Sequence, residues 1–402
     1  MTRSIPLLCA LAATFASGAS AADPASLRDA LAATRPALDL RYRHESVDDD
    51  AFARDAEAHT LRARLGAKTG SWEGWSAYAE IEHVEALFGE RYDSTANGRP
   101  AYPVVADPEA TELNQAWLAW APRAGTSMTL GRQRVVLDNM RHFGNVGFRQ
   151  NEQTFDAFQL QHAVGAATTL RYAYLEEVHR VFGDDHPNPI AAEQDLDAHL
   201  LHATRTVGGG ALVGYGYFVE NQDLPATSAR TLGLRWTGTH AFERGFALVH
   251  ALEYARQDDY ADGAAVIDAD YALGEIGIGR AGHVLKAGIE VLGGDGDYGF
   301  QTPFATLHAF NGWADRFLTT PRDGLVDRYL VASGKLGAFD YAVAAHDYEA
   351  DHGSADYGSE WGASLRRAFG PHVEAEAKAT RYDAERHATD VTKLWLALTL
   401  KY

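Results

Sequence analysis

The last twelve residues of the chain alternate strictly between two kinds of side chain. In the segment VTKLWLALTLKY, four leucines and the final Tyr402 occupy one face, whereas lysine, tryptophan, alanine and threonine occupy the other. A period of two with one apolar face indicates a β-strand. The segment therefore restricts this part of the chain to a sheet whose two faces meet different surroundings.

The same period recurs along most of the chain. Leucine and tyrosine at Leu38, Leu40 and Tyr42 alternate with charged residues, and similar patterns occur at 61–65, 170–174, 361–366 and 373–377. About eighteen such segments of roughly 9 to 13 residues occur, which is the length that a tilted strand needs to cross a bilayer. The strong charge opposite the apolar face is expected when lipid lies outside and water inside. Near 113–121, 246–255 and 325–336 both faces are apolar, so the inward face stays open there.

The connections between these segments indicate a closed barrel. Short links near Gly70, Gly125, Gly165, Gly209, Gly245, Gly282, Gly337 and Gly370 alternate with longer ones at 46–56, 85–111, 135–153, 179–194, 221–228, 257–268, 293–324, 350–356 and 384–390. Short periplasmic turns and long extracellular loops alternate in this way in outer-membrane barrels. After the first twenty or so residues, no stretch approaches the roughly 18 uncharged residues of a membrane helix, so strands must span the membrane as a closed ring. We predict an all-β, transmembrane antiparallel barrel of about eighteen strands.

The two ends of the chain agree with this prediction. Arg3, an apolar run over 5–15 and the small residues at 19–21 form a typical signal peptide, with cleavage after Ala21. An alternative buried helix lacks a polar face, and a lipid anchor at Cys9 lacks the small residue that should precede it. We therefore expect a signal peptide at 1–21 and one barrel domain at 22–402. The terminal strand resembles the signal that the barrel-assembly machinery recognises.

Composition limits the partners. The formal net charge of −19 at pH 7 argues against nucleic acid. We expect a Gram-negative outer membrane as the location, with its lipid and lipopolysaccharide as neighbours. We predict no cofactor and no metal site. The run GGDGDYG at 293–299 resembles part of a calcium loop but lacks the closing glutamate, so bound calcium stays an open question.

Two long segments carry a family resemblance. The first contains GRQ at 131–133, FRQ at 148–150 and TFDA at 154–157, and the second contains LHAFNGWADRF at 307–317. Together these segments resemble the alginate-export family of outer-membrane channels. The resemblance implies an eighteen-stranded barrel with a basic pore, which inward-folded loops constrict and through which a linear polyuronate leaves the cell.

Arginine suits a pore for carboxylates because its planar guanidinium can make two hydrogen bonds to a carboxylate and stays charged. The residues that we expect at the constriction, or in contact with an anionic saccharide, are Arg132, Arg134, Arg141, Arg149, Gln150, Trp313 and Arg316. The residues that we expect to line the lumen are Arg41, Arg43, Arg62, Arg64, Arg171, Arg235 and Arg366. The alternative for each arginine is that it pairs with an acid on a neighbouring strand and braces the wall.

Arg132 does not fit the strand pattern. Strict alternation after Met128 and Leu130 would point Arg132 into lipid, which costs about 2 to 4 kcal/mol at the midplane. We therefore expect the GRQ segment at the rim or in the constriction. The aromatic side chains of the second segment could stack on sugars, although a small core that holds the loop to the wall explains them as well.

The resulting hypothesis is a channel for an anionic polysaccharide or oligosaccharide. The alternative is an uptake porin for small anionic or sugar-like nutrients. An enzyme is not expected, because the sequence contains no GxSxG or HExxH motif and only His308 stands out among 17 histidines. For His308 we favour structural packing.

Overall fold

The computed structural model describes residues 24–402 as a closed barrel of eighteen antiparallel strands. The predicted signal peptide at 1–21 lies outside the described residues. The strands are β1 (Arg35–Asp49), β2 (Ala56–Lys68), β3 (Trp75–Ala86), β4 (Ala110–Arg123), β5 (Thr126–Gln133), β6 (Thr154–Val164), β7 (Thr168–His179), β8 (Glu193–Val207), β9 (Gly210–Asn221), β10 (Ala229–Ala241), β11 (Phe246–Asp259), β12 (Asp268–Arg280), β13 (His283–Leu292), β14 (Leu325–Leu336), β15 (Phe339–Glu349), β16 (Asp356–Phe369), β17 (Val373–Ala384) and β18 (Val391–Lys401). The expected fold and strand number are confirmed.

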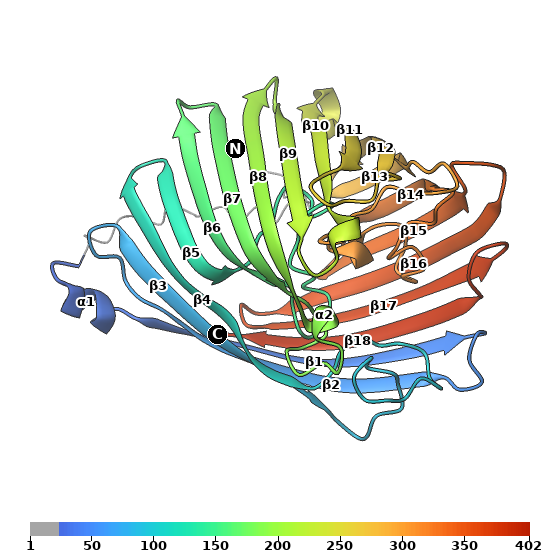
Figure 1. The fold of residues 1–402 in the computed structure, drawn as a ribbon, viewed down its shortest axis with the longest axis horizontal. Coiled ribbons are helices and arrows are strands. Elements are labelled where there is room, and N and C mark those ends of the chain that lie inside the picture. The colour runs from blue at the N-terminus through green and yellow to red at the C-terminus, as the bar shows by residue number, and fades with distance from the viewer. Residues whose placement is uncertain (1–23) are drawn as a thin grey trace.

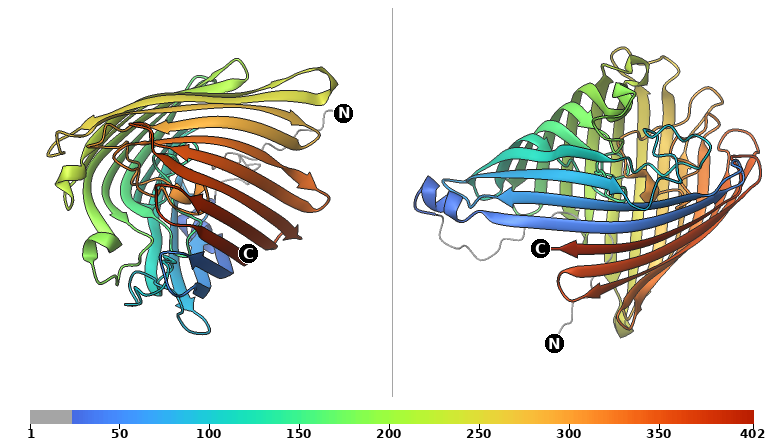
Figure 2. Two further views of the ribbon diagram at one scale, coloured as in Figure 1. Left: turned by 90° about the vertical axis from the view of Figure 1, so that its right-hand side faces the viewer. Right: turned by 90° about the horizontal axis from the view of Figure 1, so that it is seen from below.

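Each strand pairs with its neighbours in sequence, and the last strand closes the ring on the first (Figure 1). The pairing of β1 with β18 extends from Asp39 opposite Lys401 to Asp49 opposite Val391. Beyond β18, the backbone N–H and C=O of Tyr402 both bond to Leu38 at 2.8 Å. Figure 2 shows the end of the chain lying beside β1. Every one of the described strands therefore has a partner on both of its edges.

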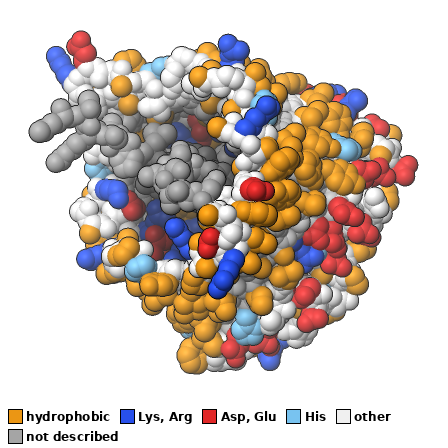
Figure 3. Space-filling model, turned by 90° about the vertical axis from the view of Figure 1, so that its left-hand side faces the viewer, with side chains coloured by type: hydrophobic (Ala, Val, Ile, Leu, Met, Phe, Trp, Pro, Cys, Tyr) orange, Lys and Arg blue, Asp and Glu red, His pale blue; other side chains and the backbone are white. Residues whose placement is uncertain are grey.

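The outer face of the wall is apolar. In β18, Leu394, Leu396 and Leu398 are exposed on the outside, whereas Lys393 and Trp395 are buried on the inside. Hydrophobic side chains cover much of the outer surface in Figure 3, and charged side chains show within the hollow. An apolar exterior around a polar interior is the arrangement of a transmembrane barrel.

The structure shows which face points into the lumen in the three segments that have two apolar faces. In β4, Asn114 is an extra residue at a register shift opposite Glu80 and Ile81, so both Asn114 and Gln115 are buried. This bulge is the reason why strict alternation fails at 113–121. In β11 and β14, the exposed Leu252 and Leu330 face outward.

The links alternate in length as expected. The short helical pieces lie outside the strands: α1 (Leu27–Ala32) precedes β1, α2 (Pro189–Ala192) precedes β8, and three 3₁₀ turns occupy Pro225–Thr227, Glu243–Gly245 and Leu307–Ala309. None of the helices among the described residues has the length and apolar character needed to cross a membrane. The long links 134–153 and 293–324 fold into the lumen, and we name them loop A and loop B.

We predict that Tyr402→Asp impairs assembly, because a charge would replace a ring that is 78% exposed at the end of the closing strand. The measurement is the fraction of protein that migrates fast on a detergent gel before boiling, since a closed barrel resists unfolding. Tyr402→Phe is the matched control and should assemble normally. Normal assembly of Tyr402→Asp would contradict the role given to this terminus.

Candidate functional site: a basic cavity in the lumen

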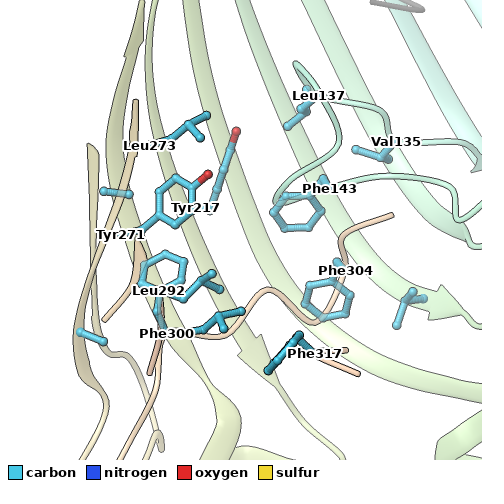
Figure 4. Close-up of a cluster of buried hydrophobic side chains, with 14 of the residues drawn as sticks. Val135, Leu137, Phe143, Tyr217, Tyr271, Leu273, Leu292, Phe300, Phe304 and Phe317 are labelled. Atoms are coloured by element: carbon cyan, nitrogen blue, oxygen red, sulfur yellow. The ribbon is translucent and has the colours of Figure 1, made fainter. Parts of the chain in front are cut away.

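Loops A and B join each other inside the barrel. The N–H of Gly144 in loop A bonds to the carbonyl of Phe304 in loop B at 2.9 Å, and the side chain of Gln153 bonds to the same carbonyl at 3.0 Å. The rings of Phe143 and Phe304 stack with centroids 5.5 Å apart (Figure 4). Buried aromatic residues of the wall, including Tyr217 and Tyr271, complete this hydrophobic cluster. The two loops therefore form one packed body that narrows the lumen.

Arg141 fastens the two loops to the wall. Its guanidinium donates to Asn311 Oδ1 of loop B at 3.0 Å, and its Nε lies 2.8 Å from Glu290 Oε1 of β13. It also lies over the ring of Phe310, 4.7 Å from the centroid. Arg141 is 1% exposed, so the expectation that it contacts a solute is corrected. Burial of an arginine requires such partners, and here they come from loop B and the wall.

The tip of loop A rests on β1 and β2. Gln150 is 0% exposed, accepts a hydrogen bond from Arg41 Nε at 2.8 Å and donates to Thr60 Oγ1 at 2.8 Å. Arg149 lies between Glu45 Oε2 at 3.1 Å and Asp315 Oδ2 of loop B at 3.3 Å. Gln150 thus holds the loop in place and does not meet the pore. Arg149 is largely neutralised by its two carboxylates.

A cavity of about 130 Å³ lies in the lumen beside this loop tip. Its walls come from β1, β2, β17, β18 and Phe148 of loop A. We call it the basic cavity, because five cations and two carboxylates line it. The charged lining residues are Arg41, Arg43, Arg62, Lys378, Lys401, Glu374 and Glu376.

Three of the five cations have a carboxylate partner and two do not. Arg43 pairs with Asp107 and Glu45, and Arg62 and Lys401 share Asp39 at 2.7 and 3.6 Å. Among the described residues, no carboxylate oxygen lies within 4.0 Å of the charged nitrogens of Arg41 or Lys378. Arg41 instead donates to Gln150 and to backbone carbonyls of loop A. The cavity therefore holds two cations that make no direct ion pair with a described carboxylate, beside Glu374 and Glu376 of the same lining.

Lys378 lies in an aromatic setting at the edge of this cavity. Its Nζ is 4.6 Å from the ring centroids of Phe148 and Trp313, and 2.9 Å from His308 Nε2. Burial lowers the pKa of His308 to about 3, so the ring is neutral at pH 7 and its Nε2 can accept from the ammonium. His308 Nδ1 then donates to Asp315 Oδ1 at 2.7 Å. This chain of bonds fixes the position of the ammonium group, and it gives His308 the packing role that we expected.

Trp313 and Arg316 attach loop B to the wall. The indole of Trp313 lies on Gly362 of β16, where a Cβ atom would come within 2.6 Å of the ring, so only glycine fits there. The backbone N–H of Trp313 bonds to Glu360 Oε1 at 2.5 Å. Arg316 pairs with Asp49 Oδ2 at 2.9 Å and donates to the carbonyl of Thr389 at 2.8 Å. Trp313 borders the cavity only through Lys378, and Arg316 contacts the rim of the wall.

Arg132 and Arg134 lie on opposite sides of the barrel wall. Continuous pairing of β5 with β6 keeps Arg132 on the same face as Leu130, which is 61% exposed, so Arg132 lies on the outer face. There it binds both oxygens of Asp156 at 2.9 and 3.0 Å. The expectation of Arg132 at the constriction is thus corrected: Arg132 follows the strict alternation of the strand and points outward, where Asp156 balances its charge. Arg134 faces the lumen and pairs with Glu152 of loop A.

The remaining wall arginines face the lumen, and most have partners. Arg64 pairs with Glu82, Arg235 with Glu253, and Arg366 lies 3.8 Å from Glu374. Arg171 bonds to Gln161 at 2.9 Å. Pairing across neighbouring strands is therefore the role of several of these residues. The sequence did not single out Phe148, Asp107 or Trp395 for the site: Phe148 begins the FRQ segment, but only Arg149 and Gln150 of that segment were expected there.

We predict that Arg141→Met loosens the loops without opening the barrel. Removing one partner of a buried ion pair costs about 3 to 5 kcal/mol, because Glu290 would keep a buried, unpaired charge. Single-channel recordings should show higher and noisier conductance, and limited proteolysis should cut loop A faster. Arg132→Met, the same change on the outer face, should do neither. Unchanged conductance and proteolysis in Arg141→Met would contradict this role.

Comparison with known proteins supports the fold. No protein-family profile and no curated protein sequence matches the chain. Among solved structures, Pseudomonas aeruginosa OccK9 (OpdG) aligns with a TM-score of 0.73 at 16% identity, covering 93% of this chain and 100% of that one. OccK2 (OpdF) of the same organism, in complex with glucuronate, aligns with a TM-score of 0.69 at 14% identity over 92% of this chain and 99% of that one.

A third structure, P. aeruginosa OpdK with vanillate, aligns with a TM-score of 0.70 at 13% identity, covering 92% of this chain and 99% of that one. These proteins are outer-membrane porins of the Occ group, and the similarity concerns the fold. Together with the apolar outer face, it places this chain in the Gram-negative outer membrane. The chain therefore has the closed, eighteen-stranded fold of an outer-membrane porin.

Proposed function

We propose that the protein is an outer-membrane channel for the uptake of small carboxylates, with the basic cavity as its selectivity site. The observation that carries this proposal is that Arg41 and Lys378 in the lumen make no direct ion pair with a described carboxylate. A carboxylate that enters the cavity can complete the pairing that the protein leaves open. Hydrogen bonds to charged groups contribute about 1.5 to 3 kcal/mol each, which is enough to select anions without trapping them.

The similar structures favour the same class of solute. OccK2 is in complex with glucuronate and OpdK is with vanillate, and both of these molecules are small carboxylates. The aromatic rings of Phe148 and Trp395 line the cavity beside its cations. A flat ring or a sugar face that carries one carboxylate suits this combination.

The same findings weigh against export of alginate or another polyuronate. The comparisons give no support to the alginate-export family, and they favour the uptake alternative. Arg132 of the GRQ segment lies outside the pore, and Gln150 of the FRQ segment is fully buried. Loops A and B are fastened to each other and to the wall by buried contacts, whereas a polymer needs a continuous open path.

An enzymatic role has no support in the site. The similar structures are porins, and His308, the histidine that stood out in the sequence, is held between Asp315 and Lys378. Its neutral ring contributes to the position of the ammonium group. The cavity is therefore described best as a binding step on a path through the lumen.

We predict that Lys378→Gln weakens anion selectivity. The substitution removes one charge without leaving a buried acid unpaired. In planar bilayers, the reversal potential in a KCl gradient should shift toward cations, and block of the current by glucuronate should need about tenfold higher concentration. Arg132→Gln removes an equal charge on the outer face and serves as the control, with selectivity unchanged.

Two results would contradict the proposal. One is a cation preference of the unmodified channel, because the cavity would then not set its selectivity. The other is passage of an anionic oligosaccharide of several uronate units as fast as the monomer in a liposome-swelling assay. That second result would restore the polysaccharide hypothesis.

A further inference from the structure

A cluster of histidine and glutamate lies on the outer face of the barrel, away from the lumen. His44 of β1 is directly opposite His59 of β2, and their rings stack with centroids 4.5 Å apart. Glu57 lies two residues before His59 on the same strand and therefore on the same face. Each of the three residues offers one ligand atom, and these atoms all lie within 4.8 Å of one another. We name this group the outer His–Glu cluster.

The cluster lies at the edge of the apolar belt, where the exposed Leu396 of β18 is directly opposite His44. Outward side chains of β1 run from Leu38 and Leu40 to Tyr42, and then become polar at His44 and Ser46. All three members of the cluster are half-buried. Part of each side chain therefore stays accessible from outside the barrel at this edge of the belt.

Neighbouring side chains already orient the possible ligands. The hydroxyl of Tyr42 lies 2.8 Å from His59 Nδ1, and the Nε2 of that ring makes no hydrogen bond to any residue from 24 to 402. Ser46 donates to Glu57 Oε1 at 3.1 Å, while Glu57 Oε2 lies 2.6 Å from His44 Nε2. Hydrogen bonds of this kind, from outside the ligand set, fix ring and carboxylate orientation in metal sites.

We propose that His44, Glu57 and His59 bind one divalent transition-metal ion of the zinc class. Two imidazoles and one carboxylate are a ligand set that zinc takes, with water as a fourth ligand. Tetrahedral zinc at about 2.1 Å from each atom places ligand atoms about 3.4 Å apart. Because the three atoms already lie within 4.8 Å, small side-chain rotations suffice. The bound ion would join β1 to β2 at the membrane boundary.

A second cluster provides the contrast. Asp156, Glu177 and His179 also bring three ligand atoms within 4.8 Å on the outer face. There, however, the guanidinium of Arg132 binds both oxygens of Asp156. A cation of the protein already occupies that position, so a metal would have to displace it. In the outer His–Glu cluster, no guanidinium of the described residues forms a hydrogen bond or ion pair with the three side chains. Arg91 bonds to Glu57 only through its backbone carbonyl, and its charge acts on the cluster from a greater distance.

The test is zinc binding to the untagged, folded barrel in detergent, measured by calorimetry. We expect one ion per chain. His59→Asn and Glu57→Gln should each weaken binding at least tenfold, whereas His179→Asn in the second cluster should leave binding unchanged. Cobalt in place of zinc should give the intense visible absorption of a four-coordinate site, and His59→Asn should abolish it.

Migration on unboiled gels shows whether each variant is folded. The Glu57→Gln variant keeps the shape of the side chain, so it still tests the proposal if the His59→Asn variant does not fold. The proposal is overturned if the unmodified barrel binds no stoichiometric zinc. It is also overturned if a folded Glu57→Gln or His59→Asn variant binds zinc as tightly as the unmodified barrel, or if His179→Asn loses binding equally.

Discussion

The backbone hydrogen bonds between β1 and β18 are the interaction on which the rest of the molecule depends. Inside a bilayer, an unpaired N–H or C=O group has no water to bond to, so a sheet is stable there only when its two edges join. Here the pairing continues from Asp49 opposite Val391 to the contact of Tyr402 with Leu38. Closure separates a lipid-facing surface from a wet lumen, and it thereby permits both the apolar belt and the charged interior.

The closed lumen in turn permits irregular backbone at membrane depth. Loops A and B can lie there because protein and lumen groups satisfy their polar atoms. Many of these bonds are made by Arg141, Arg149 and Gln150. From the sequence alone, we expected all three residues at the constriction or in contact with the solute. Gln150 uses its side-chain hydrogen bonds to hold loop A against β1. The cations that no described carboxylate contacts directly, Arg41 and Lys378, are what remains for an anionic solute.

The architecture was predictable from the sequence because the period of two and the link lengths are local signals. They predicted the strand number and the inward face of most strands, although three segments with two apolar faces stayed open. The bulge at Asn114 was not predictable, since an extra residue leaves no trace in a segment with two apolar faces. The partners of each arginine were not predictable either. Arg132 and Arg141 look alike in the sequence, yet one binds Asp156 on the outer face and the other Glu290 in the interior.

The central claim is that the basic cavity binds a small carboxylate in the lumen. The most direct measurement is an experimental structure of the barrel with saturating glucuronate. We predict density for the carboxylate between Arg41 and Lys378, beside Phe148 and Trp395. Glucuronate bound elsewhere in the lumen, or a cavity that stays empty at saturating concentration, would contradict the account.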